Sequence, residues 1–236
     1  MSDAKQDEKV YPDVEPDEDK VYRIAEAVTS LLPAGQVVLH SLIVPPIQKR
    51  MEEWIEKIEN RLMELEKEER VDLESLKDNQ EFSALLLRTI QSAAITSQEE
   101  QLDNLRNYVL NITLPNDHSE DELYIILSII SDFTPSHARA LHFYCFPEEY
   151  MDQISKFNRS INLRINQPSQ NRIGQELSEI LGNGDMDYWL YVFNILDSKN
   201  LVEARRITPI QTSPDIIINA VSTEFGKKVM SMIKDV

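Results

Sequence analysis

A run without a single formal charge, Ala27 to Gln48, constrains this chain more than any other feature. Its length alone makes it a candidate membrane span, because about 20 apolar residues cross the hydrocarbon core of a bilayer. Its composition argues against a span, since Pro33, Pro45 and Pro46 interrupt it. Backbone groups that a proline frees would lack hydrogen-bond partners in lipid. We therefore predict a buried helical hairpin, broken near Pro33 and again at Pro45 and Pro46.

A conditional membrane segment is the alternative for the same stretch. Residues 24–46 would then be hidden in the resting fold and released on activation. The motivation is the order of segments, in which an uncharged pair of helices precedes a charged amphipathic helix. Under this alternative the protein is a membrane-acting effector, and vesicle leakage is its test.

Negative charge is concentrated in the first half of the chain. The formal net charge is −17, and the last hundred residues are nearly neutral. The first half should repel nucleic acid and anionic lipid. Residues 1–19 are acidic and poor in apolar residues, which predicts a disordered tail without a secretory signal. Cys145 is the only cysteine, which fits a reducing compartment, so we expect a cytoplasmic protein.

Residues 20–132 predict a helical, bundle-like region. The strongest helix begins at Pro46, a favoured first position. Helix-start signals follow at Asn79 (or Asp78), at Ser97 with Glu100 and at Ser119 with Glu122. The buried face of the first helix is given by apolar residues at spacings of three and four: Ile47, Met51, Trp54, Ile58, Leu62 and Leu65.

Residues 133–236 predict a winged-helix-like α+β region. A helix starts at Thr134–Pro135, whereas residues 147–171 show no sustained helical period and a short strand is predicted over 161–165. Two helices, two strand-like segments and a closing helix follow. They are predicted at 172–182, 185–201, 202–207, 215–222 and 222–236. The fold class is therefore mainly α, a helical bundle-like region followed by a winged-helix-like region.

Catalytic chemistry finds little support in the sequence. His142 and Cys145 lie three residues apart on one helix, but no second His/Cys pair completes a metal site. The segment around Asp185 resembles the start of a calcium loop but lacks the glycine and glutamate that such a loop requires. Nucleotide-binding and hydrolase motifs are absent from the chain. We predict no catalytic residues, no metal, no cofactor and no enzyme activity.

Two groups of residues in the last third are candidate contacts. Four bases could give weak, salt-sensitive contacts with nucleic acid or with a partner protein: Arg205, Arg206, Lys227 and Lys228. Asp185 and Asp187 oppose DNA binding, because they would meet phosphate at the start of the reading helix. Tyr188, Trp189 and Tyr191 form the second group. They cannot all face inward together with Phe193, so we predict an exposed aromatic patch that binds a partner.

The chain also resembles a known family in the order of its segments. The stretches "PPIQKRMEEWIEKIENRLMELE", "LLLRTIQSAAITSQEEQLDNLRNYVLNITLP" and "FTPSHARALHFY" are similar to uncharacterised bacterial proteins with the plan of the abortive-infection alpha-like family. The closing "STEFGKKVMSMI" resembles that family's winged-helix finish, with Phe225–Gly226 where Leu-Gly is expected. The resemblance covers residues 24–236 and implies a bacterial cytoplasmic protein in phage defence. It carries over no catalytic residues.

The sequence as a whole predicts a non-enzymatic interaction or regulatory module. We expect it to recognise another protein, or a second copy of itself, through helix faces and the wing. A winged-helix DNA-binding regulator and the membrane-acting effector remain the alternatives. Membrane contact is expected only conditionally.

Overall fold

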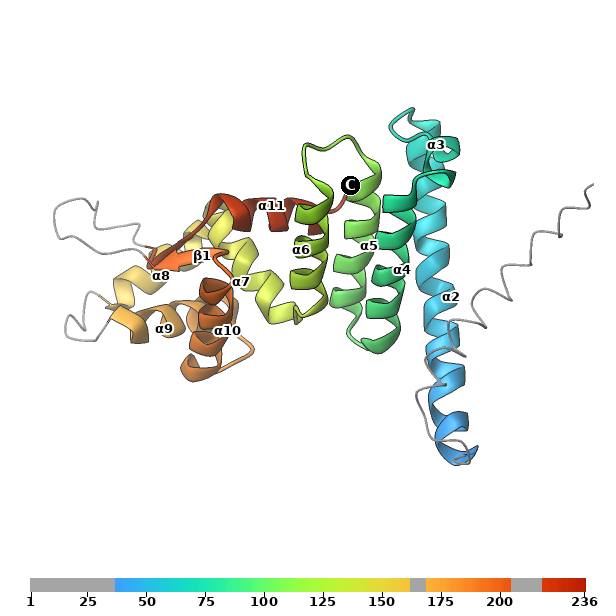
Figure 1. Cartoon of the computed structure of the whole chain (residues 1–236). Helices are drawn as coiled ribbons and strands as arrows, with labels where there is room; N and C mark the ends of the chain where they lie inside the picture. The colour runs from blue at the N-terminus through green and yellow to red at the C-terminus, as the bar shows by residue number, and fades with distance from the viewer. Residues whose placement is uncertain (1–36, 162–168, 205–217) are drawn as a thin grey trace, which may run out of the picture. The chain divides into compact units, whose positions relative to one another are not determined.

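A computed structural model describes residues 37–161, 169–204 and 218–236 (Figure 1). Within these residues the protein is mainly helical, with one small two-stranded antiparallel sheet near the C-terminus. This confirms the predicted fold class at the level of helices and one strand pair. The chain divides into two compact units, residues 1–59 and 60–236. The second unit carries most of the described elements.

Helix α2 (Val37–Lys67) is continuous through Pro45 and Pro46. The predicted break at these prolines is therefore wrong. A proline within a helix removes one ladder hydrogen bond and crowds the carbonyl four residues before it, which is why a break was predicted, but its φ near −65° is itself a helical value and α2 keeps both prolines. The first predicted break, at Pro33, lies outside the described residues, as do the side chains of 37–46. In the part of the chain that is described, no helix combines the length and apolar character needed to cross a bilayer.

Four of the six residues predicted for the apolar stripe of α2 are buried, and the other two, Ile47 and Leu62, are half-buried. Met51, Trp54, Ile58 and Leu65 each expose 5% or less of their surface. Glutamate and lysine residues occupy the opposite side and are exposed. The three- and four-residue spacing therefore identified the inner face of this helix correctly.

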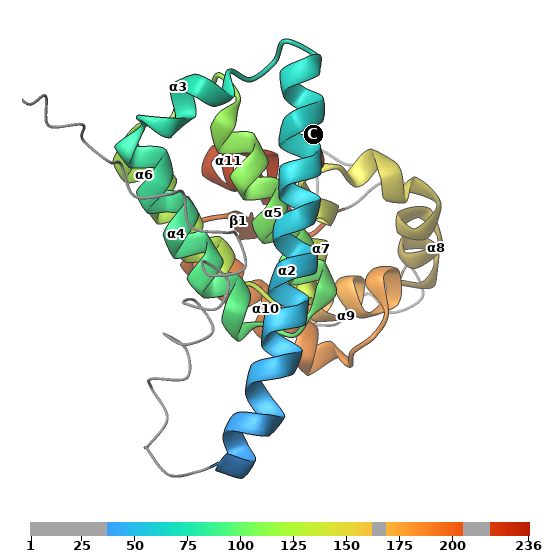
Figure 2. The same cartoon turned by 90° about the vertical axis from the view of Figure 1, so that its right-hand side faces the viewer.

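Four helices open the second unit after the end of α2. They are α3 (Leu73–Lys77), α4 (Gln80–Ile95), α5 (Glu99–Thr113) and α6 (Glu120–Ser131). Helix α4 packs against both α5 and α6, and these three run side by side in Figures 1 and 2. Their inner faces are apolar, and Leu105, Ile126 and Ile130 are completely buried.

Two of the three predicted caps in this part of the chain form. The side chain of Asn79 accepts a hydrogen bond from the backbone N–H of Phe82 at 3.0 Å, and that of Ser119 accepts from Glu122 N–H at 3.3 Å. The predicted capping box of Ser97 and Glu100 is wrong, because α5 starts one residue later with Gln98 at the cap position.

The next elements are helical throughout the described residues. They are α7 (Pro135–Cys145), the short 3₁₀ helix η1 (Pro147–Tyr150), α8 (Met151–Ile161), α9 (Ser169–Leu181) and α10 (Met186–Ser198). The irregular segment predicted from residue 147 is therefore wrong as far as Ile161. Ile154 and Phe157 are the buried apolar positions of α8, and two such positions gave too weak a period to detect. Most of the predicted strand at 161–165 lies outside the described residues.

Strands β1 (Val202–Ala204) and β2 (Ala220–Ser222) form the sheet, with Val202 opposite Ser222. The two predicted strands are thus confirmed over three residues each, and they pair antiparallel. Residues 205–217, including the rest of the predicted strands, lie outside the description.

Helix α11 (Glu224–Ile233) runs across α5 and α6 in Figure 1 and packs on both. Thr223 caps it by accepting from Gly226 N–H at 2.9 Å. A side chain at Gly226 would collide with the backbone carbonyl of Leu201, so glycine is required for this close approach. The carbonyls at the far end accept hydrogen bonds from α5, Ile233 from Asn107 at 3.0 Å and Lys234 from Asn111 at 2.9 Å.

Candidate functional site

The outward face of α10 carries the predicted aromatic patch, with one correction. Tyr188 and Tyr191 expose 42% and 63% of their surface. Trp189 is completely buried, and its indole Nε1–H donates to the Gly182 carbonyl at 2.8 Å. Trp189 therefore belongs to the core and makes no part of an exposed surface.

Helical geometry explains this division. Trp189 lies three, four and seven residues from Val192, Phe193 and Leu196, which are all buried. These positions share one side of a helix with 3.6 residues per turn. Tyr191 falls on the other side. The same spacing is visible in the sequence and could have assigned Trp189 to the core.

Tyr188 is held in place by contacts with α7 and with its neighbour. Its hydroxyl donates to the Ser136 hydroxyl at 2.8 Å, and its ring meets Trp189 edge-on with 5.6 Å between the ring centroids. Asp185 fixes the start of α10, because its carboxylate accepts from Tyr188 N–H at 2.8 Å. This end of the patch is therefore ordered before any partner arrives.

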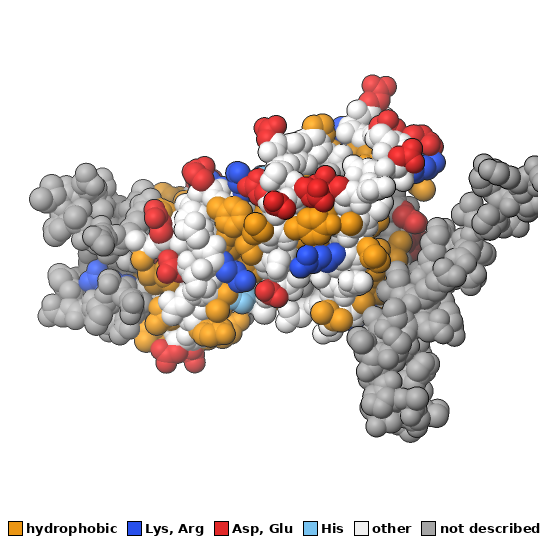
Figure 3. Space-filling view, in the orientation of Figure 1, with side chains coloured by type: hydrophobic (Ala, Val, Ile, Leu, Met, Phe, Trp, Pro, Cys, Tyr) orange, Lys and Arg blue, Asp and Glu red, His pale blue; other side chains and the backbone are white. Residues whose placement is uncertain are grey.

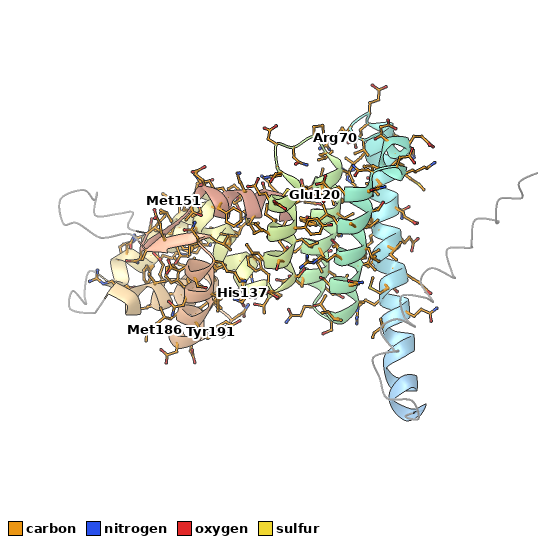
Figure 4. All side chains as sticks on the ribbon, in the orientation of Figure 1. Arg70, Glu120, His137, Met151, Met186 and Tyr191 are labelled. Carbon is orange, nitrogen blue, oxygen red and sulfur yellow. The ribbon has the colours of Figure 1, made fainter. Side chains whose placement is uncertain are left out.

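The charged side chains nearest to the two tyrosines along the chain are carboxylates. From Ile173 to Ser198 the chain contains no lysine, arginine or histidine. The exposed acids in this stretch are Glu179, Asp185, Asp187 and Asp197. Acidic and hydrophobic side chains lie together at the lower end of α10 in Figure 3, the end where Figure 4 labels Met186 and Tyr191. We call Asp185, Asp187, Tyr188 and Tyr191 the acidic aromatic face.

The predicted basic residues do not form a free cationic surface in the described part of the chain. Lys227 Nζ lies 2.7 Å from Glu224 within α11. Lys228 Nζ lies 2.6 Å from Glu122 and so links α11 to α6. The hydrogen bonds from Lys228 and His118 lower the pKa of the Glu122 carboxyl below its usual range. Arg205 and Arg206 lie outside the described residues.

A buried carboxylate, Glu176 on α9, was missed by the sequence analysis. It is fully buried and accepts hydrogen bonds at Oε1 from Asn219 N–H at 3.2 Å and from Asn219 Nδ2 at 3.1 Å. The Tyr144 hydroxyl donates to it at 3.4 Å, and burial, followed by Glu176, raises the pKa of Tyr144 well above its usual value. The sequence does contain a signal for Glu176, because this charged residue lies between Ile173 and Leu177 on the apolar side of a helix. The contacts fix the start of β2 to α9.

His137 is a second buried polar residue, at the start of α7. Its Nδ1 accepts from the backbone N–H of Thr134 at 3.1 Å, which places the ring hydrogen on Nε2. Nε2 is buried and has no hydrogen-bond partner in the described structure. Burial, and secondarily the charge of Lys199, lowers the pKa of His137. The imidazole is therefore maintained in its neutral form.

The residues weighed as metal ligands take part in local packing. His142 Nδ1 lies 3.1 Å from the Tyr150 hydroxyl. Burial raises the pKa of the Cys145 thiol. No three His, Cys, Asp or Glu side chains converge as ligands in the ranges that the structure covers.

No protein-family model, curated protein or solved structure matches this chain. The geometry of the acidic aromatic face is therefore the basis for assigning a function.

Proposed function

We propose that the protein is a non-enzymatic interaction module that binds a basic partner protein through the acidic aromatic face of α10. The observation that carries this proposal is the combination of two exposed tyrosines with exposed carboxylates in a stretch without cations. Tyrosine is enriched among the residues that dominate binding energy at protein interfaces. Carboxylates around it favour encounter with a positively charged surface.

The fixed geometry of Tyr188 supports the same function. A side chain that is already ordered loses little conformational entropy when a partner binds. Tyr188 meets this condition through its hydrogen bond to Ser136. Tyr191 is more exposed and offers ring surface that a partner can cover. Tyr188 therefore supplies a fixed contact, and Tyr191 supplies a larger apolar area.

A DNA-binding regulator is the weaker alternative. If this region is interpreted as a winged helix, α9 and α10 correspond to two of the helices of that fold and the strand pair to its wing. Helix α10 would then enter the major groove. The described residues of α10 include no base and two acids, Asp187 and Asp197. These carboxylates would be repelled by phosphate, and Lys228 already pairs with Glu122. The charge on α10 therefore favours a basic protein over nucleic acid.

The resemblance to abortive-infection alpha-like proteins suggests a setting for this module. If it holds, the basic partner belongs to a bacterial response to phage infection. The proposal for α10 does not depend on this setting, because it rests on the residues of the helix.

The test is capture and identification of a partner with matched variants of the full chain. Immobilised wild-type protein should retain a basic protein. The Tyr191→Ala variant should bind that protein about 30-fold more weakly and so fail to retain it, as expected for a central tyrosine that contributes about 2 kcal/mol. Asp187→Lys should reduce binding further at low salt. Ile95→Ala is the control, because Ile95 is 80% exposed on α4 and lies outside the proposed face.

Two results would overturn the proposal. Equal retention of the same partner by wild type, Tyr191→Ala and Asp187→Lys would show that α10 is not the contact surface. Salt-dependent binding of random duplex DNA by the wild type, with no basic protein retained, would favour the regulator.

A further inference from the structure

Tyr191, which is labelled in Figure 4, lies where an apolar stripe and a polar stripe meet on the outward side of α10. Tyr188 and Ile195 lie three residues before it and four residues after it, and they form the apolar stripe. Asp187 and Asn194 lie four residues before it and three residues after it, and they form the polar stripe. A side chain that approaches Tyr191 from outside therefore meets apolar groups on one flank and polar groups on the other.

The polar groups beside Tyr191 are free to bind a ligand. Asp187 and Asn194 are exposed, and the side chain of neither forms a hydrogen bond or an ion pair with any residue that the structure describes. The same holds for the Tyr191 hydroxyl. The next cation along the chain, Lys199, has its Nζ 3.5 Å from Asp132. Within the described residues, no cation therefore pairs with Asp187.

A guanidinium group matches this arrangement better than an ammonium group does. Side chains four residues apart on a helix have their Cβ atoms about 5–6 Å apart, so Asp187 and Tyr191 can contact one planar group together. A guanidinium is planar, has five N–H donors and stacks on aromatic rings, whereas an ammonium is a compact and strongly hydrated charge. The guanidinium can donate to both oxygens of Asp187 while its face lies on the Tyr191 ring. Asn194 adds an amide oxygen as a further acceptor.

We infer that the acidic aromatic face binds an arginine side chain of its basic partner, at the junction of Asp187, Tyr191 and Asn194. The methylene groups of the arginine then lie along Tyr188 and Ile195, because the stem of this side chain is apolar. Charge complementarity supports this occupant, since α10 contains no base. The inference rests on the proposed function, because it names the chemical group by which that partner is recognised.

The first experiment titrates the full chain with two peptides of equal length and charge. One is a five-residue peptide of alternating glycine and arginine with blocked ends, and the other has lysine in place of each arginine. NMR signals of Tyr191 and Asn194 report binding. We expect saturable shifts with a dissociation constant on the order of millimolar, as is usual for so small a ligand. The arginine peptide should bind about threefold more tightly than the lysine peptide, because stacking on an exposed ring has a modest energy.

Two variants separate the contributions of charge and ring. Asp187→Asn keeps the size of the side chain and removes its charge, and it should weaken binding of the arginine peptide about fivefold. Tyr191→Leu keeps an apolar side chain and removes the ring, so the two peptides should then bind equally. Asp197→Asn is the matched control, because Asp197 is also an exposed acid of α10 but lies about three turns further along the helix. It should bind the arginine peptide as the wild type does.

Four results would each overturn the inference. They are equal binding of the two peptides by the wild type, the absence of saturable shifts, unchanged affinity in Asp187→Asn, and equal losses in Asp187→Asn and Asp197→Asn. The proposed function fails differently, through equal retention of the captured protein by the wild type, Tyr191→Ala and Asp187→Lys. Normal capture together with equal binding of the two peptides would leave α10 as the contact surface and remove only the assignment of arginine.

A competition experiment connects the peptides with the captured partner. The arginine peptide should displace the basic protein from the immobilised full chain at about one third of the concentration that the lysine peptide requires, in proportion to the expected affinities. Displacement at equal concentrations, or by neither peptide, contradicts the inference.

Discussion

Helices α10 and α11 both carry residues that the sequence marks as candidate contacts, yet their side chains are engaged differently. On α11, Lys227 and Lys228 pair with Glu224 and Glu122, and Gly226 lies against Leu201. On α10, Tyr191 and Asp187 point outward from a helix whose other side is buried. The candidate lysines of α11 are therefore already paired within the protein, whereas the candidate residues of α10 are available to a partner. Exposure alone does not separate the two helices, because Lys228 is also half-exposed.

The largest effect on stability is expected from Gly226→Ala. The added methyl group would collide with the Leu201 carbonyl and force α11 away from the start of β1. Overpacking of this kind costs about 3 kcal/mol, which urea denaturation of the purified chain can measure. Ser231→Ala, at an exposed position of α11, is the control and should change stability by less than about 0.5 kcal/mol. Similar stabilities of the two variants would show that α11 is not tightly held.

Glu176→Gln should have the next largest effect, about 2 kcal/mol. The substitution replaces one of the two carboxylate oxygens by an amide N–H₂, which faces either the donors of Asn219 at the Oε1 position or the Tyr144 hydroxyl at the Oε2 position. A buried hydrogen bond is therefore lost or weakened in either orientation. Hydrogen exchange at the start of β2 should accelerate together with the loss of stability. Glu179→Gln, one turn away and exposed, provides the matched control. A stable variant with unchanged exchange at Asn219 and Ala220 would contradict this role.

Acid should destabilise the protein through His137. Burial lowers its pKa from the ordinary value of 6.5, so the unfolded chain takes up the proton first. The contribution is present above pH 6.5 and is lost as the pH falls through the lowered pKa of the folded state. Denaturation at about pH 7.5 and about pH 5.5 measures this slope.

His137→Gln should flatten that pH dependence, because glutamine is also favoured three residues after a threonine cap but does not titrate. The change also bears on α10, since Ser136, which holds Tyr188, is in the same turn. An equal slope in the variant and the wild type would exclude His137 as the cause.

Lys228→Ala should have a small effect, about 0.5 kcal/mol, because its ion pair with Glu122 leaves the lysine side chain half-exposed to solvent. Added salt should reduce the difference from the wild type further. Lys227→Ala is the comparison, and its pair within one helix should contribute less still. Neither variant should change capture of a partner through α10. A strong loss of capture in Lys228→Ala would place the contact surface on α11 instead.

Local signals in the sequence predicted much of the helical framework. Asn79 and Ser119 are polar caps that satisfy free N–H groups, and both were recognised from their positions before an apolar period. Ser97 shows the limit, because the neighbouring Thr96 and Gln98 offer alternative starts for the same helix. Where several polar residues precede a helix, tertiary packing decides which of them becomes the cap.

Contacts between distant segments could not be predicted from one sequence. Lys228 meets Glu122, and Asn219 meets Glu176, only because the fold brings separate helices and strands together. Trp189 differs, since its burial follows from its spacing to Val192 and Leu196 on one helix.

The attachment of α11 at both ends has a consequence for how the chain reaches its native state. Its first turn is held at Leu201, and its last carbonyls meet the amides of Asn107 and Asn111, the former 126 residues earlier in the chain. Contacts over such separations require a large loop to close, which slows folding. During synthesis, the contacts of Asn107 and Asn111 with α11 can therefore form only after α11 has emerged and docked.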